Sequence, residues 1–243
     1  MRIAVIADVH ANLAALEAVL ADIQSENISE IISLGDNIGY GPDPEEVLIE
    51  LQKQKITSVM GNHEYALINN HYFSRLNPDP RKSLEITKPM LSLQSLAYSQ
   101  NLEKVIIRHG VRLVHGCPPR SLTAYLYYPS MNMLEKIFAS YPEKICFYGH
   151  THTLNFFEQG RSPGQGMDVT LGTRKLHEEC NYIINPGSVG QPRDRINNHS
   201  KYLIWDLEAS IVTFKAVQYD VMRTVHRMRS LHLPSFNADR LLR

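Results

Sequence analysis

The 243-residue sequence lacks an excess of charge of either sign. Lys plus Arg and Asp plus Glu both count 25, and no acidic tail is present. A polynucleotide backbone normally requires a basic groove, so the composition does not favour a nucleic-acid binder or a nuclease. Any phosphate-rich partner must therefore be held by a local site.

Cysteine is scarce. Cys117, Cys146 and Cys180 form an odd, widely spaced set without a Cys-x-x-Cys pair. This pattern argues against both a disulfide framework and a thiolate zinc site. We therefore expect a protein of the reducing cytoplasm.

Long apolar runs are also missing. Residues 3–7 are apolar, but Asp8 and His10 interrupt the run well short of a secretory signal, and no segment approaches the length of a membrane span. No internal repeat or linker divides the chain, which is long enough to bury a full α/β core. We expect one domain over residues 1–243, with helices in residues 220–243 packed on it.

What the sequence does contain is an alternation of strands and helices. Strands are predicted at residues 2–7, 30–34 and 56–60, with a helix beginning after Asn12 and another at Pro44. Each of these strands ends in polar residues. This alternation predicts a βαβ array whose site lies along the carboxyl edge of the sheet.

The later elements are predicted from the same signals. Helices are expected at residues 83–100 and 129–140, hairpins at 105–114 and 202–217, strands at 145–148, 154–158 and 182–184, and a flexible connection at 160–166.

Two histidines follow the apolar strand at residues 145–148. Gly149 frees the backbone there, and His150 and His152 come next. They lie on one side if the strand continues, and both project from its carboxyl edge if the chain turns. An isolated His-x-His is more often a pair of surface-loop histidines, so the rest of the chain decides.

Polar residues with ligand atoms end five of the predicted strands. They are Asp8, His10, Asp36, Asn62, His63, His115, His150 and His152. Carboxylate, imidazole and amide donors without cysteine suit Mn²⁺, Fe²⁺ or Zn²⁺. Even seven of these eight donors exceed what one tetrahedral ion needs, so the set favours two ions sharing a carboxylate, for which Asp36 is the candidate.

These residues fall into five short motifs. The motifs are Asp8-Val9-His10, Gly35-Asp36, Gly61-Asn62-His63-Glu64, His115-Gly116 and Gly149-His150-Thr151-His152. In this order they resemble the motif series of the calcineurin-like metallophosphoesterases. Residues 185–194 and 233–243 also resemble a small prokaryotic branch of that family, so the resemblance extends over nearly the whole chain.

The resemblance implies an α/β fold, a four-layer α/β/β/α sandwich with two mixed β-sheets and a dinuclear metal site at the strand carboxyl ends. The ions, Mn or Fe first and Zn as a further candidate, would be held as follows: the first by Asp8, His10, Asp36 and His152, the second by Asp36, Asn62, His115 and His150. A metal-bridging hydroxide would attack a phosphodiester or phosphomonoester of a small phosphorylated substrate. His63 would protonate the leaving oxygen or stabilise the transition state.

One departure from the family bears on the substrate. The pattern GDxxDRG, whose first Asp is the bridging one, is typical of the protein phosphatases of the superfamily. In this sequence Gly39 and Tyr40 stand where that pattern has its second Asp and its Arg. The departure argues against a protein phosphatase and against diadenosine tetraphosphatases with a similar Arg. Tyr40 is a candidate for packing against the substrate or hydrogen-bonding to it.

Two weaker substrate candidates are Arg193 and Arg195, which follow a Gly/Ser-rich loop and suit bidentate phosphate contacts, although such loop arginines are more often solvated. A non-catalytic protein-interaction scaffold of the same fold is the alternative function. Retention of all seven donors weighs against it. The sequence leaves open the native metal, the physiological substrate, monoester or diester preference, and the oligomeric state, a homo-oligomer included.

Overall fold

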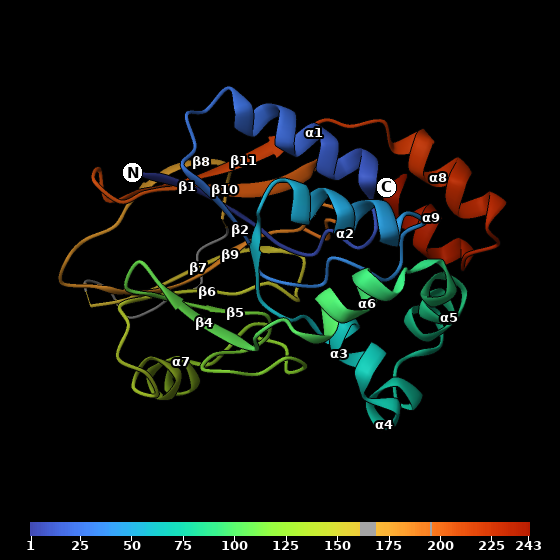
Figure 1. The fold of residues 1–243 in the computed structure, drawn as a ribbon. Coiled ribbons are helices and arrows are strands. Elements are labelled where there is room, and N and C mark those ends of the chain that lie inside the picture. The colour runs from blue at the N-terminus through green and yellow to red at the C-terminus, as the bar shows by residue number, and fades with distance from the viewer. Residues whose placement is uncertain (161–168, 195) are drawn as a thin grey trace.

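The computed structural model describes residues 1–160, 169–194 and 196–243, and two β-sheets form its centre (Figure 1). The six-stranded sheet has the order β3-β2-β1-β10-β11-β8, and the five-stranded sheet has the order β4-β5-β6-β9-β7. The first comprises β1 (Arg2–Ile6), β2 (Glu30–Ser33), β3 (Thr57–Ser58), β8 (Gly172–Lys175), β10 (Ser200–Asp206) and β11 (Ile211–Val217). The second comprises β4 (Val105–Arg108), β5 (Val111–Val114), β6 (Ile145–Phe147), β7 (Leu154–Gln159) and β9 (Asn181–Pro186).

Both sheets are mixed. In the first, β1 pairs parallel with β2 and antiparallel with β10. In the second, β6 lies parallel to β5 and β9, while the edge strands β4 and β7 are antiparallel. Parallel neighbours bring their carboxyl ends to the same edge, which is where polar residues follow β1, β2, β5 and β6.

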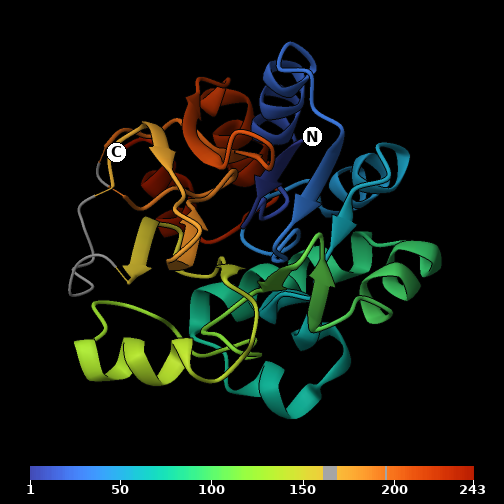
Figure 2. The same cartoon turned by 90° about the vertical axis from the view of Figure 1, so that its left-hand side faces the viewer.

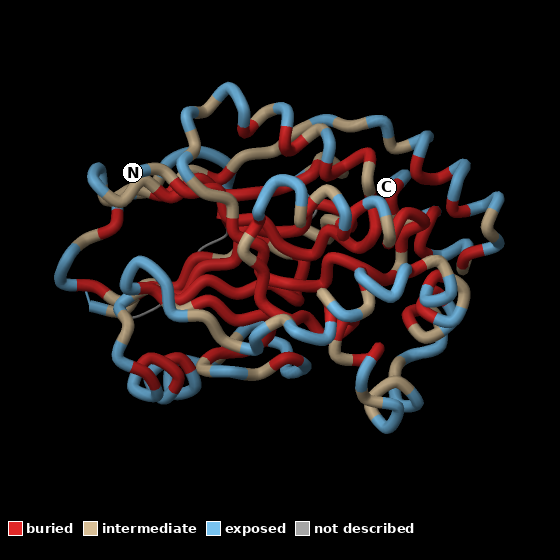
Figure 3. Tube along the Cα trace, viewed as in Figure 1, coloured by how far each residue is buried: buried red, intermediate tan, exposed pale blue. Residues whose placement is uncertain are grey.

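Helices cover the outer faces of the two sheets. Helices α1 (Leu13–Gln24) and α2 (Pro44–Lys53) cover the six-stranded sheet, and α7 (Met131–Phe138) covers the other (Figures 1 and 2). Strand β1 is buried on both faces: Ile3 and Val5 point into the core between the sheets, and Ala4 and Ile6 pack with the helices. Figure 3 shows that the buried residues, drawn in red, run along the strands of these sheets. The predicted four-layer sandwich is confirmed.

The remaining helices gather near one end of the sheets (Figure 1). They are α3 (Asn62–Ile68), α4 (Asn70–Ser74), α5 (Pro78–Thr87), α6 (Leu93–Gln100), α8 (Val221–Ser230) and α9 (Ser235–Leu241), with the 3₁₀ turn η1 (Lys88–Met90). The single helix predicted over residues 83–100 is wrong. Pro89 has no N–H to continue the helix ladder, and the Ser92 side chain starts α6 by accepting from Ser95 N at 3.1 Å.

Helices α8 and α9 contact the rest of the chain through buried polar pairs. The Thr224 hydroxyl donates to Asn12 Oδ1 at 2.7 Å, and Asn237 Nδ2 donates to Ser83 Oγ at 3.1 Å. Asn12 is also the predicted N-cap of α1, accepting from Ala15 N at 3.2 Å. The one-domain organisation itself stays a prediction. The connection predicted at residues 160–166 lies, apart from Gly160, outside the described residues.

Within the described ranges, none of the helices has the length and apolar character needed to cross a membrane.

Candidate metal centre

All eight residues predicted for the site are buried together where the carboxyl edges of the two sheets meet. Asp8 and His10 follow β1, Asp36 follows β2, and Asn62 and His63 begin α3 just after β3. His115 follows β5, and His150 and His152 follow β6. None of the eight is more than 5% exposed. Because the six-stranded sheet supplies the first five and the five-stranded sheet the last three, the cluster spans both sheets.

The backbone at five of these residues is left-handed. Asp8, His10, Asp36, His150 and His152 have φ between 50° and 68°. Such conformations cost about 1–3 kcal/mol each for residues other than glycine, and they persist where the surrounding structure imposes them. Of the two alternatives left open by the sequence, the chain therefore takes the turn after Gly149, and the two histidines project from it at the strand edge.

His10 and His152 face each other across the first part of the cluster. Their Nε2 atoms are 3.0 Å apart. His10 Nδ1 donates to Ile38 O at 3.0 Å and His152 Nδ1 to Gln191 O at 2.8 Å, so each Nε2 carries a lone pair. Burial lowers the pKa of both imidazoles well below the usual value. A cation bound by both Nε2 atoms would relieve the repulsion of the two facing lone pairs.

Asp8 completes this group. Its Oδ1 lies 3.9 Å from His10 Nε2 and 3.7 Å from His152 Nε2, and both carboxylate oxygens accept from His150 N at 3.1 Å. Burial raises the pKa of Asp8 to about 7. We call Asp8, His10 and His152 the first half-site.

The second half-site consists of Asn62, His115 and His150. His115 Nε2 lies 3.1 Å from both His150 Nδ1 and Asn62 Oδ1. The outer nitrogens are occupied, since His115 Nδ1 donates to Leu34 O at 2.8 Å and His150 Nε2 to Thr123 O at 3.2 Å. Burial opposes protonation of His115, but the Asp36 carboxylate outweighs it and raises the His115 pKa to about 9. Surroundings that favour a proton on His115 would also favour the positive charge of a metal cation.

Asp36 contacts both half-sites. Its Oδ2 lies 3.1 Å from His115 Nε2 and 3.8 Å from His10 Nε2, and its Oδ1 accepts from His63 N at 2.8 Å. A carboxylate in this position can be shared by two cations. The donor types, the facing lone pairs and the shared carboxylate together fit two divalent ions.

His63 lies beside the first half-site, with its ring centroid 4.9 Å from that of His10 and 4.8 Å from that of Tyr40. Its Nδ1 is buried and has no hydrogen-bond partner in the described structure. Gly39, at φ +83°, makes room for this ring, since a Cβ atom there would lie 1.9 Å from His63 Nδ1. The departure at residue 39 thus has a structural role.

The three substrate candidates differ in placement. The Tyr40 ring packs edge-on against the His10 ring, with the two ring centroids 4.6 Å apart. Arg193 lies near it, with its guanidinium carbon 5.7 Å from the centre of the Tyr40 ring, and Arg193 N donates to His152 O at 2.9 Å. Arg195 lies outside the described residues.

Glu64, which is part of the Gly61–Glu64 motif but received no predicted role, holds the Asp36 loop. Its carboxylate accepts from the N–H groups of Asp36 at 3.0 Å, Asn37 at 2.7 Å and Gly61 at 2.9 Å. Burial raises the Glu64 pKa to about 7, whereas these donors favour the carboxylate. The available signal was its place in the first turn of α3, where a glutamate commonly reaches back to free N–H groups.

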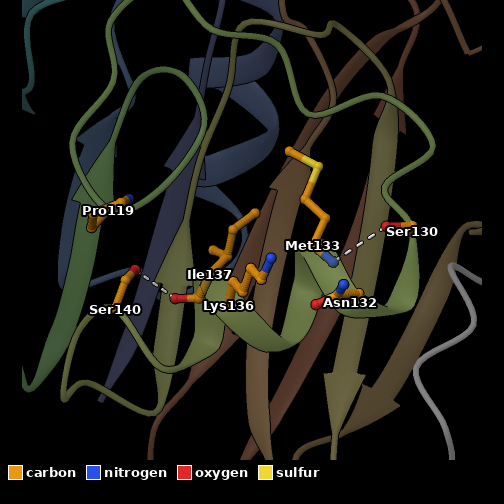
Figure 4. A pocket seen from close by; sticks show the side chains of 7 residues that line it. All are labelled: Pro119, Ser130, Asn132, Met133, Lys136, Ile137 and Ser140. Atoms are coloured by element: carbon orange, nitrogen blue, oxygen red, sulfur yellow. Dashed lines mark hydrogen bonds between the residues drawn. The ribbon is translucent and has the colours of Figure 1, made fainter.

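A hollow of about 390 Å³ lies away from the buried cluster, beside α7 (Figure 4). Its lining residues are Pro119, Ser130, Asn132, Met133, Lys136, Ile137 and Ser140. Ser130 Oγ accepts from Met133 N, and Ser140 Oγ donates to Ile137 O. Because these hydroxyls only complete the ends of the helix, the hollow contains no catalytic group comparable to the buried cluster.

Comparison with known proteins agrees with this geometry. The profile of the Calcineurin-like phosphoesterase superfamily domain matches residues 1–210. The chain belongs to this superfamily. The uncharacterized protein MJ0912 of Methanocaldococcus jannaschii is 32% identical over 244 residues, covering 98% of this chain and 96% of that protein.

Two solved structures are similar over nearly their full length. A metallophosphoesterase from Sphaerobacter thermophilus is 34% identical with a TM-score of 0.85, covering 100% of this chain and 98% of the other. The hypothetical protein PH1004 from Pyrococcus horikoshii OT3 has a TM-score of 0.79 at 19% identity, covering 99% and 97%. At that identity the second likeness supports the fold alone.

Proposed function

We propose that this protein is a dinuclear metal-dependent phosphoesterase that hydrolyses a phosphodiester or phosphomonoester bond of a small phosphorylated compound. The observation that carries the proposal is the pair of His10 and His152, whose unprotonated Nε2 atoms face each other at 3.0 Å. Membership of the calcineurin-like superfamily supports phosphoester hydrolysis as the reaction.

The seven donors would divide between two ions, with Asp36 shared by both half-sites. Oxygen and imidazole donors without thiolate favour Mn²⁺ or Fe²⁺, and Zn²⁺ is also compatible. When bound, the ions would activate water for in-line attack on phosphorus and neutralise charge on the phosphate oxygens. Only Asp8 and Asp36 among the donors are acidic, so the loaded site would attract phosphate without a basic surface.

His63 would act on the leaving oxygen. It is attached directly to the donor Asn62 but faces Tyr40 and His10, so its ring can reach a substrate without being a ligand. Burial lowers the pKa of His63 below its usual value, although Asp36 opposes this. The negative phosphate of a bound substrate favours the protonated ring, which can then donate its proton.

Tyr40 and Arg193 would orient the substrate on the side of the first half-site. The Arg193 guanidinium lies against the Tyr40 ring and can contact a phosphate oxygen.

The cytoplasm stays the proposed compartment.

The test is hydrolysis of p-nitrophenyl phosphate and bis-p-nitrophenyl phosphate with added Mn²⁺. We expect turnover of at least one ester and a fall in kcat of about 10² to 10⁴-fold in His63→Ala, with both ions retained. His71→Ala is the matched control, because His71 is exposed on α4. If the wild type hydrolyses neither ester and His63→Ala behaves identically, the proposal fails.

Metal analysis separates the enzyme from a non-catalytic scaffold of the same fold. We expect close to two ions per chain after incubation with Mn²⁺ and dialysis. A content near zero would favour the scaffold.

A further inference from the structure

Two arginines beside the first half-site share a single neutral acceptor. Arg193 Nη2 donates to the side-chain oxygen of Gln191 at 2.8 Å, and Arg240 Nη1, from α9, donates to the same oxygen at 3.3 Å. The two positive side chains that meet on this amide oxygen repel each other, and the neutral amide has no charge that offsets the repulsion.

The acidic residues next to these arginines in the sequence are paired elsewhere. Asp194 lies 3.4 Å from the Nζ atom of Lys201, which is fully buried, and Asp239 lies 3.5 Å from an Nη atom of Arg229. Within the part of the chain that the structure describes, neither Arg193 nor Arg240 has a carboxylate oxygen within 4 Å. Neither arginine therefore forms an ion pair with a carboxylate of these described residues.

Two further observations indicate that the pair has room for an acceptor. Arg193 Nε is buried and has no hydrogen-bond partner among the described residues. Burial and, after it, the charge of Arg193 lower the pKa of Arg240. An anion placed between the guanidinium groups would accept a hydrogen bond from Arg193 Nε and would offset the repulsion between the two positive charges.

The pair borders the metal centre. Gln191 O accepts from His152 Nδ1 at 2.8 Å, so the residue whose side chain joins the arginines also orients a ring of the first half-site. The Arg193 guanidinium lies against Tyr40, whose ring contacts His10. A molecule with one phosphate at the half-sites can therefore reach the arginines with another part.

We infer that Arg193 and Arg240 bind a second phosphate group of the substrate, which makes the substrate a small bisphosphate or diphosphate compound. The inference rests on the proposed function. Two guanidinium groups carry the charge that matches a phosphate dianion, and each offers parallel N–H donors to its oxygens. Gln191 holds the two side chains together when no anion separates them.

The test compares inhibitors of p-nitrophenyl phosphate hydrolysis with Mn²⁺ present. Alkane diphosphonates with two, three and four carbons are compared with alkyl monophosphonates of the same lengths. We expect at least one diphosphonate to inhibit about ten- to a hundredfold more strongly than its monophosphonate, as for a gained charge-assisted contact. Equal inhibition at all three lengths would overturn the inference.

Variants assign the preference to the pair. Arg240→Gln removes the guanidinium group, whose carbon lies 4.5 Å from the centre of the Phe236 ring, and we expect it to reduce the diphosphonate preference at least tenfold, with Arg240→Lys intermediate. Arg243→Ala removes the same charge nearby and should keep the preference. An unchanged preference in Arg240→Gln would refute the assignment, and equal inhibition by phosphonocarboxylates would replace the second phosphate by a carboxylate.

A binding measurement keeps this inference separate from the proposed function. In metal-free, dialysed protein, propane-1,3-diphosphonate should raise the melting temperature of the wild type more than that of Arg240→Gln. That result would support the anion site even if no phosphate ester is hydrolysed. Equal shifts in both proteins would contradict it.

Discussion

The two half-sites are similar in shape but differ in charge. Each has two imidazoles whose ring nitrogens face at about the same distance, 3.0 Å for His10 and His152 and 3.1 Å for His115 and His150. The first half-site adds the carboxylate of Asp8, whereas the second adds the neutral amide of Asn62. The second therefore depends on the shared Asp36 for all of its negative charge, and we expect it to hold its ion more weakly.

The largest effect should come from removing the shared carboxylate. We expect Asp36→Asn to lose the second ion completely, to weaken the first, and to lower kcat by more than the 10²- to 10³-fold, or about 3–4 kcal/mol, typical of losing one charge-stabilising donor. Elemental analysis after dialysis and the rate with p-nitrophenyl phosphate measure this. Asp220→Asn is the control, because this exposed N-cap keeps its function as asparagine. Two retained ions in Asp36→Asn would refute a shared carboxylate.

The next effect separates the two half-sites. His152→Ala should weaken the first ion and His150→Ala the second, each leaving one ion tightly bound, as followed by metal titration. Adding Asn62→Ala to His150→Ala should cost little more, since both act on one ion, whereas adding it to His152→Ala should remove both ions. Equal loss of both ions in the two single variants would count against the assignment.

A smaller effect should leave both half-sites intact. Gly39→Ala places a Cβ atom against His63 Nδ1, so we expect it to displace the ring and lower kcat about 10²-fold with two ions still bound. Gly110→Ala tests backbone strain alone, because Gly110 also has positive φ, +75°, but no neighbouring atom within 4 Å of an added Cβ. Full activity in Gly39→Ala would show that His63 need not lie where the structure places it.

The smallest effects concern aromatic rings that support one half-site each. Tyr125 stacks on His150 with centroids 3.9 Å apart, while Tyr40 contacts His10. We expect Tyr125→Leu to weaken the second ion and Tyr40→Leu the first, each by about 1 kcal/mol, or about fivefold. Competition with a fluorescent chelator measures both. Weakening of the same ion by both variants would contradict the division.

The residues of the buried cluster could be predicted from the sequence, but the groups that orient their side chains could not. Each donor follows an apolar strand in a recognisable motif, so Asp8 or His115 is visible locally. The acceptors for the imidazole rings are main-chain oxygens of Ile38, Leu34 and Gln191, and any residue type supplies such an oxygen. Arg240 was overlooked because its place beside Gln191 depends on how α9 packs.

The same limit explains the errors in the fold. The long helix predicted over residues 83–100 followed apolar spacing and ignored Pro89, where local backbone chemistry prevailed. Helices α3 and α4 are short, and their apolar positions are too few to show a period. The alternation of strands and helices predicted a βαβ array, and the four-layer sandwich was implied by the family resemblance that the motifs carry.

Each half-site draws on both sheets. In the first, His152 follows a strand of the five-stranded sheet, whereas Asp8 and His10 follow a strand of the six-stranded sheet. In the second, Asn62 comes from the six-stranded sheet, whereas His115 and His150 come from the five-stranded sheet. Ion binding at the half-sites would therefore be coupled to association of the sheets, because a chain with separated sheets would have no complete site. By mass action, free metal at a hundred times its dissociation constant adds about 2.7 kcal/mol per ion to the free energy of unfolding. The metal supply would thus set the thermal stability of the protein as well as its turnover.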